Sequence, residues 1–217
     1  AILLPANFDA YREYSRRFKD AVAGIAPRIE DRGIDEIYID LSDLPDESNT
    51  LARRIKQTVF DATGLTCSIG ITPNKLLSKI CSDLDKPNGI TLLGMEDVAT
   101  RIWPLPARKI NGIGPKAAER LTKFGVDTIG QLAATPVDFL IGKFGRSTGT
   151  WLHRVAHGID ERPVITESEP KSISRESTFE RDLDARMDRA ELSEIFTALC
   201  LRVADDLKRK GYASRTI

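Results

Sequence analysis

The sequence has 217 residues, and its 32 Lys+Arg balance its 32 Asp+Glu, so the formal net charge at pH 7 is +0. A composition of 41% hydrophobic and 29% charged residues excludes disordered and fibrous proteins. The length suits one large or two to three small domains. No apolar run approaches the roughly 20 residues that a membrane helix needs, so we expect no membrane partner.

The first 105 residues follow a mixed α/β pattern. Apolar residues at helical spacing predict helices over residues 8–25, 51–64 and 75–84, the last with Thr72 as N-cap and Pro73 in its first turn. Alternating apolar residues predict strands near 28–30, 36–41, 67–71 and 90–93. The order α-β-β-α-β-α-β is the ferredoxin-like pattern without its opening strand, which predicts a split sheet with helices on one face.

The remainder of the chain is helical and then mixed. Short helices punctuated by glycines fill residues 106–165, and residues 160–171 read as a linker. Residues 172–179 are expected to form a strand and 190–207 a long helix, so a second α/β domain begins here. We therefore predict an α+β multidomain chain with segments at 1–105, 106–165 and 166–217.

The neutral total conceals an uneven distribution of charge among these segments. Residues 1–105 carry 13 basic and 16 acidic residues (net −3), residues 106–165 carry 9 and 5 (net +4), and residues 166–217 carry 10 and 11 (net −1). A basic middle segment is compatible with a polyanionic partner, although chance scatter produces a difference of this size.

The ends and the cysteines give two further expectations. The chain begins at Ala1 with neither an initiator Met nor a signal peptide, and residues 212–217 look like the opening of a strand. We therefore predict a fragment that is cut at both ends. Cys67, Cys81 and Cys200 are widely spaced and include no C-x-x-C pair, which predicts a reducing, cytoplasmic setting.

Two candidate sites lie in the first segment. Asp35 and Glu36 are adjacent where the turn at Gly33 enters a strand, and clustered hard oxygen ligands are what a pair of Mg²⁺ ions needs in nucleotidyl transfer. Lys86 lies on the turn after a helix, where its ammonium group suits a triphosphate. Each has an ordinary alternative: acidic residues are common at solvated turns, and a lysine at a helix C-terminus complements the dipole.

The third candidate is the stretch from Ile110 to Leu121. Gly112-x-Gly114 allows a tight turn into a helix whose free N–H groups form an anion site, with Lys116 and Arg120 beside it. Such a turn binds DNA phosphates without reading sequence, and the alternative is a simple helix–helix turn.

Other side chains of residues 144–157 suggest weaker possibilities. His153 and His157 have the spacing of a zinc-binding pair but lack the Glu that a zincin base requires, which favours surface histidines. Phe144 and Trp151 have basic neighbours, as in a stacking surface, yet aromatic residues at helical spacing usually belong to a core.

Three motifs in this order resemble those of one family. They are Gly33-Ile-Asp-Glu-Ile-Tyr-Ile-Asp-Leu-Ser42, Cys67-Ser-Ile-Gly-Ile-Thr-Pro-Asn-Lys-Leu-Leu77 and Lys86-Pro-Asn-Gly89, followed by the Gly112-x-Gly114 turn. The chain resembles the Y-family, or translesion, DNA polymerases of the bacterial polymerase IV type over essentially its whole length.

The resemblance implies an organisation and a chemistry. Residues 1–105 would be the later part of a partial ferredoxin-like palm, 106–165 an all-α helix-hairpin-helix thumb, and 166–217 a linker and the start of an α/β little finger. Asp35 would be a metal ligand and Glu36 the neighbouring catalytic carboxylate, with two Mg²⁺ ions as cofactors. Lys86 would contact the incoming dNTP, and the turn at Gly112, Gly114, Lys116 and Arg120, together with Arg175 of the little finger, would bind primer-template DNA.

The chain also departs from the family pattern. The first palm strand with its metal-binding aspartate is absent, as is the fingers domain, and the tail that binds the sliding clamp would lie beyond Ile217. Asp9 lies on a helix and is no substitute for that aspartate, and Ile37 replaces a small residue. We therefore expect no polymerase activity from this chain alone.

Two rival functions fit parts of the same sequence. One is a non-catalytic helix-hairpin-helix module that holds duplex DNA, and the reading frame upstream of Ala1 discriminates it, since the enzyme needs a further Asp-bearing strand there. The other is a ferredoxin-like nucleotidyl transferase such as a nucleotide cyclase, which has no use for a basic thumb.

Overall fold

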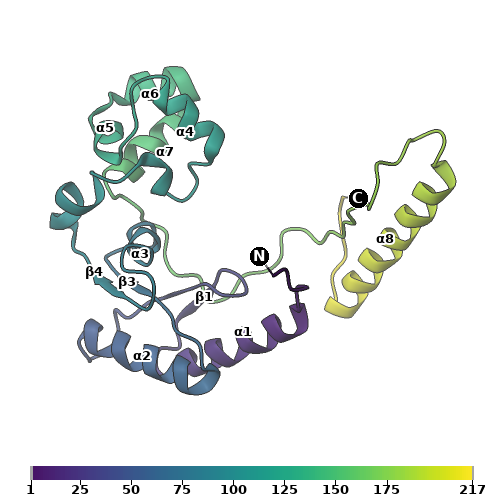
Figure 1. The fold of residues 1–217 in the computed structure, drawn as a ribbon, viewed down its shortest axis with the longest axis horizontal. Helices are drawn as coiled ribbons and strands as arrows, with labels where there is room; N and C mark the ends of the chain where they lie inside the picture. Colours follow the sequence, from purple (N-terminus) through teal and green to yellow (C-terminus); the bar gives the residue numbers. More distant parts are fainter. Residues whose placement is uncertain (1, 217) are drawn as a thin grey trace. The chain divides into compact units, whose positions relative to one another are not determined.

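The computed structural model describes residues 2–216, and the chain divides between Thr166 and Glu167 into two compact units. The α-helices and strands in the first part of the first unit are, in chain order (Figure 1), α1 (Phe8–Ala23), β1 (Ile29–Asp31), β2 (Ile37–Ile39), α2 (Ser48–Thr63), β3 (Ile69–Ile71), α3 (Lys75–Cys81) and β4 (Ile90–Leu92). This is the order that the sequence predicts.

The four strands form two separate pairs. β1 runs antiparallel to β2, with Ile29 opposite Ile39, and β3 runs parallel to β4, with Ile69 opposite Ile90. The sequence predicts one split sheet, whereas within the described residues no backbone ladder joins β2 to β3. β2 and β3 each therefore present an edge whose backbone groups are free to pair with a further strand.

Helices pack on both faces of β3, whereas the sequence predicts helices on one face. Ile69 packs with the cluster of Val22 and Ile55, which belong to α1 and α2. A side chain at the next residue, Gly70, would point to the opposite face of the strand, because successive side chains of a strand alternate between its two faces. A Cβ at Gly70 would lie 2.4 Å from the carbonyl oxygen of Ser78, so α3 packs directly on the backbone of β3. Figure 1 shows α3 on the opposite side of the strands from α2.

Local capping explains where these helices begin and end. The side chain of Asn7 accepts a hydrogen bond from Ala10 N (3.0 Å) at the start of α1, and Gly64 ends α2 in the left-handed conformation (φ 71°). The predicted N-cap of α3, Thr72, is wrong by two residues. Asn74 caps this helix by accepting from Leu77 N (3.0 Å), because its carbonyl-bearing side chain reaches the free N–H of the first turn.

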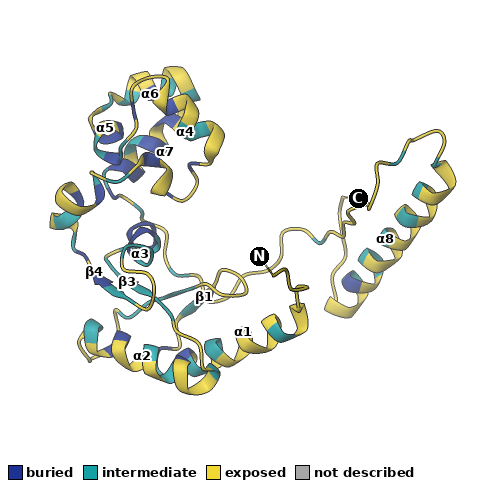
Figure 2. Ribbon diagram, viewed as in Figure 1, coloured by how far each residue is buried: buried dark blue, intermediate teal, exposed yellow. Residues whose placement is uncertain are grey.

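A helical region completes the first unit. Its elements are one-turn helices at Met95–Asp97 and Ala107–Lys109, a π-helical turn at Val98–Ile102, and the α-helices α4 (Pro115–Thr122), α5 (Ile129–Ala134), α6 (Val137–Phe144) and α7 (Arg146–Ala156). Figure 2 shows buried positions in α3, α5 and α7.

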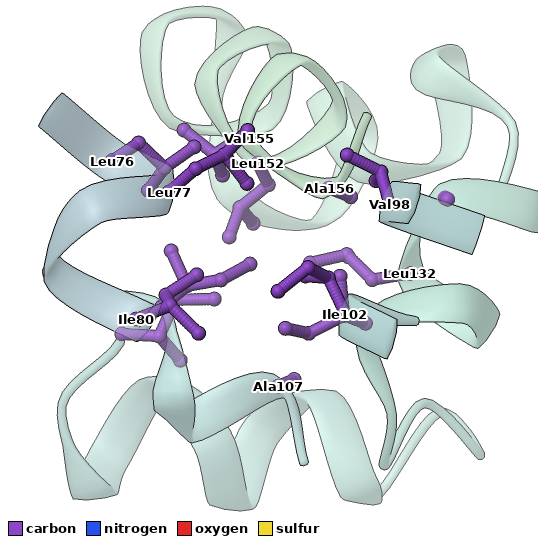
Figure 3. Packing of buried hydrophobic residues seen from close by; sticks show 14 of the residues in the cluster. Leu76, Leu77, Ile80, Val98, Ile102, Ala107, Leu132, Leu152, Val155 and Ala156 are labelled. Carbon is purple, nitrogen blue, oxygen red and sulfur yellow. The ribbon is translucent and has the colours of Figure 1, made fainter. Parts of the chain in front are cut away.

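One hydrophobic cluster joins this helical region to α3. Leu77 and Ile80 of α3 lie with Ile102, Leu152 and Val155 in a single buried cluster (Figure 3). Burying a side chain of this size stabilises the fold by about 1.5–3 kcal/mol. The cluster therefore fixes the helical region against α3.

The second unit contains α8 (Arg189–Lys210), which covers the predicted helix at 190–207. Asp206 on α8 is buried and binds Arg175, with 2.6 Å from Nε to Oδ2. The strand predicted at residues 172–179 is wrong, and residues 212–216 form none either; residue 217 lies outside the described residues. A strand requires a partner for its ladder, and no other strand is present within residues 167–216.

No helix among the described residues is sufficiently long and apolar to span a membrane.

Candidate active site and nucleic-acid interface

The two predicted carboxylates lie side by side at the entrance to β2. Asp35 and Glu36 are both exposed, and the preceding Gly33 has φ 141°, a conformation that favours glycine. Lys19 Nζ fixes this turn from α1 by donating to Gly33 O (2.7 Å) and Asp31 Oδ2 (2.8 Å). The backbone therefore holds the two carboxylates at one defined point.

Glu36 already has a cationic partner in Lys79 of α3. The Lys79 ammonium group forms an ion pair with the Glu36 carboxylate. Burial lowers the pKa of Lys79, but the hydrogen bond and the charge of Glu36 outweigh it, so this pKa lies above its ordinary value. Lys79 therefore stays charged at neutral pH and neutralises one of the two carboxylates.

The donor set fits a divalent cation only in part. Carboxylate oxygens are the ligands that Mg²⁺ prefers, and Asp35 and Glu36 supply them at adjacent positions. Among residues 2–216, however, no group of three or more His, Cys, Asp and Glu side chains is placed to hold a metal ion. Asp9 does not add to the pair, because it is exposed on α1 and bound to Arg12 (2.6 Å).

The third predicted residue, Lys86, lies on a turn that other residues hold in place. Lys56 of α2 donates to Cys67 O (2.9 Å) and to both the backbone oxygen and Oδ1 (2.5 Å) of Asn88. Lys86 itself is more than half exposed and pairs with Asp83 (2.6 Å). Its ammonium group can therefore exchange this exposed partner for an anionic ligand at little cost.

A single cavity of about 1070 Å³ brings these residues together. Asp35, Glu36, Lys79 and Lys86 all contribute to its wall. The cavity lies where the two strand pairs leave their edges unpaired, between β2 and β3. All residues of these two strands line it: Ile37, Tyr38, Ile39, Ile69, Gly70 and Ile71. Three of the predicted site residues thus share one cavity, although they come from separate parts of the sequence.

A buried ion pair beside this cavity has no obvious signal in the sequence. Lys75 Nζ donates to Glu30 Oε2 (2.6 Å), and each side chain is less than a tenth exposed. Glu30 also accepts from Ile165 N (2.9 Å). Burial raises the pKa of Glu30, but the hydrogen bonds from Lys75 and Ile165 lower it by more. The pKa of Glu30 therefore lies below its ordinary value. Lys56, Lys75 and Lys79 were all missed because their partners lie 11 to 45 residues away.

The glycine turn at residues 112–114 has the predicted geometry. Gly112 has φ 107°, and Gly114 is the N-cap of α4, with Pro115 as its first residue. Lys116 is exposed in the first turn of α4. Free backbone N–H groups and a lysine therefore meet at one helix terminus, which is an arrangement that suits phosphate.

Two predicted DNA-binding arginines have partners within their own units. Arg120 lies one turn beyond Lys116, with its guanidinium 4.7 Å from the centre of the Phe144 ring and a hydrogen bond to Lys143 O. Arg175 pairs with the buried Asp206 (2.5 Å). Each of these arginines therefore has contacts within the protein that give it a structural role. Lys116 differs from them, because it is exposed in the first turn of α4.

The histidines and the aromatic residues of the helical region take structural positions. The rings of His153 and His157 are tilted against one another with 4.5 Å between their centres. His157 Nδ1 lies 2.8 Å from His153 O, so this ring nitrogen is not directed at a shared metal. Phe144 and Trp151 are partly buried and pack against the hydrophobic cluster, in agreement with the core interpretation.

Comparison with known proteins finds three family models in sequence order. Residues 1–83 match the impB/mucB/samB family, residues 108–160 the DNA polymerase-iota thumb domain, and residues 170–217 the C-terminal domain of the impB/mucB/samB family. DNA polymerase IV of Moorella thermoacetica is 38% identical over 221 residues, which cover 100% of this chain and 54% of that protein. DNA polymerase IV 1 of Bacillus subtilis is 39% identical, over 96% of this chain and 50% of its own length.

Solved structures agree. DinB from Sulfolobus solfataricus superposes with a TM-score of 0.67 at 29% identity, over 76% of this chain and 49% of that one. A Y-family DNA polymerase chimera, Dbh-Dpo4(243-245)-Dbh, superposes with a TM-score of 0.69 at 30% identity, over 80% and 51%. This chain belongs to the Y-family of DNA polymerases.

Membership of the Y-family confirms the resemblance and the fold class that the motifs predict. Y-family polymerases are nucleotidyltransferases that use divalent metal ions, which is the chemistry that adjacent carboxylates suit. The chain spans about half the length of the curated Y-family relatives it matches.

Proposed function

We propose that this chain is part of a translesion DNA polymerase that carries out template-directed nucleotidyl transfer in DNA repair and damage tolerance. The observation that supports this most directly is the cavity shared by Asp35, Glu36 and Lys86. Its wall carries two carboxylates and an exposed cation, which are the kinds of group that nucleotide transfer from a triphosphate requires.

The carboxylates would hold the metal. Asp35 and Glu36 would bind two Mg²⁺ ions together with a third carboxylate supplied from outside the described residues. The chemistry that such ions would supply is activation of a primer 3′-hydroxyl and charge stabilisation of the leaving pyrophosphate. Lys79 would release Glu36 as the cation arrives, since the ammonium group and a metal ion compete for the same carboxylate oxygens. Lys86 would exchange Asp83 for the triphosphate of the incoming dNTP and neutralise its charge.

The gap between β2 and β3 suits the missing ligand. Both edges face one cavity, and a strand that paired with them would complete the sheet and extend beside Asp35 and Glu36. We propose that this strand carries the third carboxylate. The proposal accounts for the free strand edges and for the incomplete donor set with one segment.

We also propose the corresponding division of labour along the chain. Residues 1–105 would serve as palm, 106–165 as thumb, and 166–217 as linker and the start of the little finger. The thumb would hold primer-template DNA through the turn at Gly112, Gly114 and Lys116, with Arg120 and Arg175 as further contacts to phosphate. A sliding clamp is expected to bind through a tail outside this chain, and the enzyme is expected to act in the cytoplasm.

The proposed site is tested by Asp35→Ala in the full-length polymerase. We expect primer extension to fall by about 10³-fold or more, because the metal loses a ligand where charge develops. Asp9→Ala is the matched control, since Asp9 is an exposed carboxylate outside the cavity. Unchanged extension by Asp35→Ala would sink the assignment.

A second test uses the 217-residue chain itself. We expect it to bind DNA and to show no primer extension, because the donor set among residues 2–216 lacks a third ligand. Robust Mg²⁺-dependent extension by this chain would contradict the proposed need for a further carboxylate.

A further inference from the structure

The indole of Trp151 lies directly against the glycine turn. Trp151 belongs to α7, yet a Cβ at Gly112 would lie 2.9 Å from both Cζ2 and Cη2 of its ring. Real Cβ atoms essentially never approach so closely, so the edge of the six-membered ring contacts the backbone of Gly112. The indole ring of Trp151, from α7, thus covers one side of the turn at Gly112.

The turn has few local restraints of its own. No side-chain hydrogen bond caps α4 at Gly114, and Gly112 has φ 107°, where the backbone of a glycine is also free to adopt many other conformations. Anchors are present beneath it, because Ile110 and Ile113 are buried and Ile113 N donates to Ile110 O (3.0 Å). Trp151 supplies the contact at Gly112 itself, between these two anchors.

Trp151 differs in this respect from its neighbours on α7. Leu152, Val155 and Ala156 are fully or almost fully buried in the hydrophobic cluster, whereas Trp151 is only partly buried and packs at its margin. The chain's other tryptophan, Trp103, donates from Nε1 to Ala156 O (3.0 Å) and has a core role. The position of Trp151 is therefore suited to shaping the surface turn.

We propose that Trp151 is a positioning residue for the phosphate-binding turn of the thumb. By confining Gly112, the indole holds the start of α4 in the conformation that presents its N–H groups and Lys116 to DNA. The proposal rests on the proposed DNA-binding role of this turn. It adds Trp151 as a residue that neither the sequence motifs nor the geometry of α4 had linked to DNA binding through this turn.

The binding experiment uses the 217-residue chain and a fluorescein-labelled 20-base-pair duplex, with fluorescence polarisation measured over a range of KCl concentrations. In Trp151→Leu we expect the Kd to rise about tenfold, as happens when the competent conformation falls to about a tenth of the population. The slope of log Kd against log salt should stay unchanged, because the same phosphates are contacted once the turn has formed. Lys116→Ala, by contrast, should reduce that slope by about 1, since it removes a direct contact.

Two controls separate positioning from general damage to the fold. Phe139→Leu removes an exposed aromatic ring of α6 that packs on Phe124, and its Kd should match the wild type. Trp151→Phe keeps an aromatic ring but lacks the Cζ2 and Cη2 atoms that contact Gly112, so its Kd should lie between those of the wild type and Trp151→Leu. In ¹H–¹⁵N spectra, the Gly112 resonance of the wild type should show a ring-current shift that Trp151→Leu abolishes and Phe139→Leu leaves in place.

The outcomes are distinguishable. Wild-type affinity in a folded Trp151→Leu protein would overturn the inference, even where Lys116→Ala weakens binding and so supports the DNA-binding turn. A wild-type chain that binds no duplex would overturn both. If Trp151→Leu fails to fold, Trp151→Phe and the Gly112 shift decide: a Gly112 resonance without a ring-current shift in the wild type contradicts the proposed contact.

Discussion

The two candidate sites of the first unit are built in different ways. The cavity at Asp35 and Glu36 depends on side chains that meet across long sequence distances, such as Glu36 with Lys79. The turn at Gly112 and Gly114 consists of backbone groups and a neighbouring lysine within a few residues. A backbone site of this kind is encoded locally, while a site of converging side chains requires the fold to be complete. Variants of each site can break or sharpen this difference.

The largest effect is expected at the long-range ion pair behind the cavity. Lys75→Met removes the partner of Glu30 while both positions are buried, so we expect a loss of about 3–5 kcal/mol in the free energy of unfolding. Urea denaturation measures it. The double variant Glu30→Gln/Lys75→Met should recover part of the loss, because no uncompensated charge then remains. A cost below about 1 kcal/mol for Lys75→Met alone would show that long-range charge pairing matters little here.

A smaller effect is expected at the backbone site. Gly112→Ala combines an unfavourable φ of 107° with a Cβ only 2.9 Å from Trp151, and we expect it to cost about 1–3 kcal/mol. Gly125→Ala is the matched control, because Gly125 has φ 75° but no heavy atom within 4 Å of the added Cβ. Thermal denaturation of both variants should show the greater loss for Gly112→Ala. Equal losses would mean that backbone strain, and not the contact with Trp151, sets the cost.

The smallest effect is expected on mild acidification. The pKa of Glu30 lies below its usual 4.5, since Lys75 and Ile165 together outweigh burial. A hydrogen bond from Arg162, aided by Leu76 N, likewise outweighs burial and lowers the pKa of Asp160 below its usual 3.8. A carboxyl group whose pKa is lower in the folded protein than in the unfolded chain stabilises the fold at pH values above its unfolded-state pKa. This stabilisation is lost as the pH falls through its folded-state pKa.

Stability should therefore be level from pH 7 to about 5 and should decline below pH 4.5, as urea denaturation at each pH would show. Glu30→Gln should flatten part of this decline. Stability that rises between pH 4.5 and 3 would contradict the assigned direction of both shifts.

The sequence predicts more of the elements than of their assembly. Apolar periodicity is a local property, so α1, α2 and the four strands of the first part were predicted in the correct order. The single sheet, the helices on one face and the strand at residues 172–179 were wrong. Strand pairing and layer choice depend on partners elsewhere in the chain, and a local pattern carries no information about whether a partner is present.

The same reasoning applies within the candidate site. Turn signals in recognisable motifs single out Asp35, Glu36 and Lys86 as candidates, and all three line one cavity. Lys79, on the helix α3, is not singled out in this way, because its relation to Glu36 exists only after α3 has packed on β3. Trp151 was considered either a stacking or a core residue, and its contact with Gly112 has no counterpart in the spacing of the sequence.

The hydrogen bond from Ile165 N to Glu30 bears on how this protein is divided for experiments. The residues that follow α7 return to the start of α3: Asn74 Nδ2 donates to Gly158 O (2.8 Å), and Asp160 Oδ2 accepts from Leu76 N (3.0 Å). A truncation at residue 160, where the thumb-domain match ends, would strip Glu30 of one of its donors. A protein that ends at Thr166 keeps all three bonds, and this is where the first compact unit should be cut.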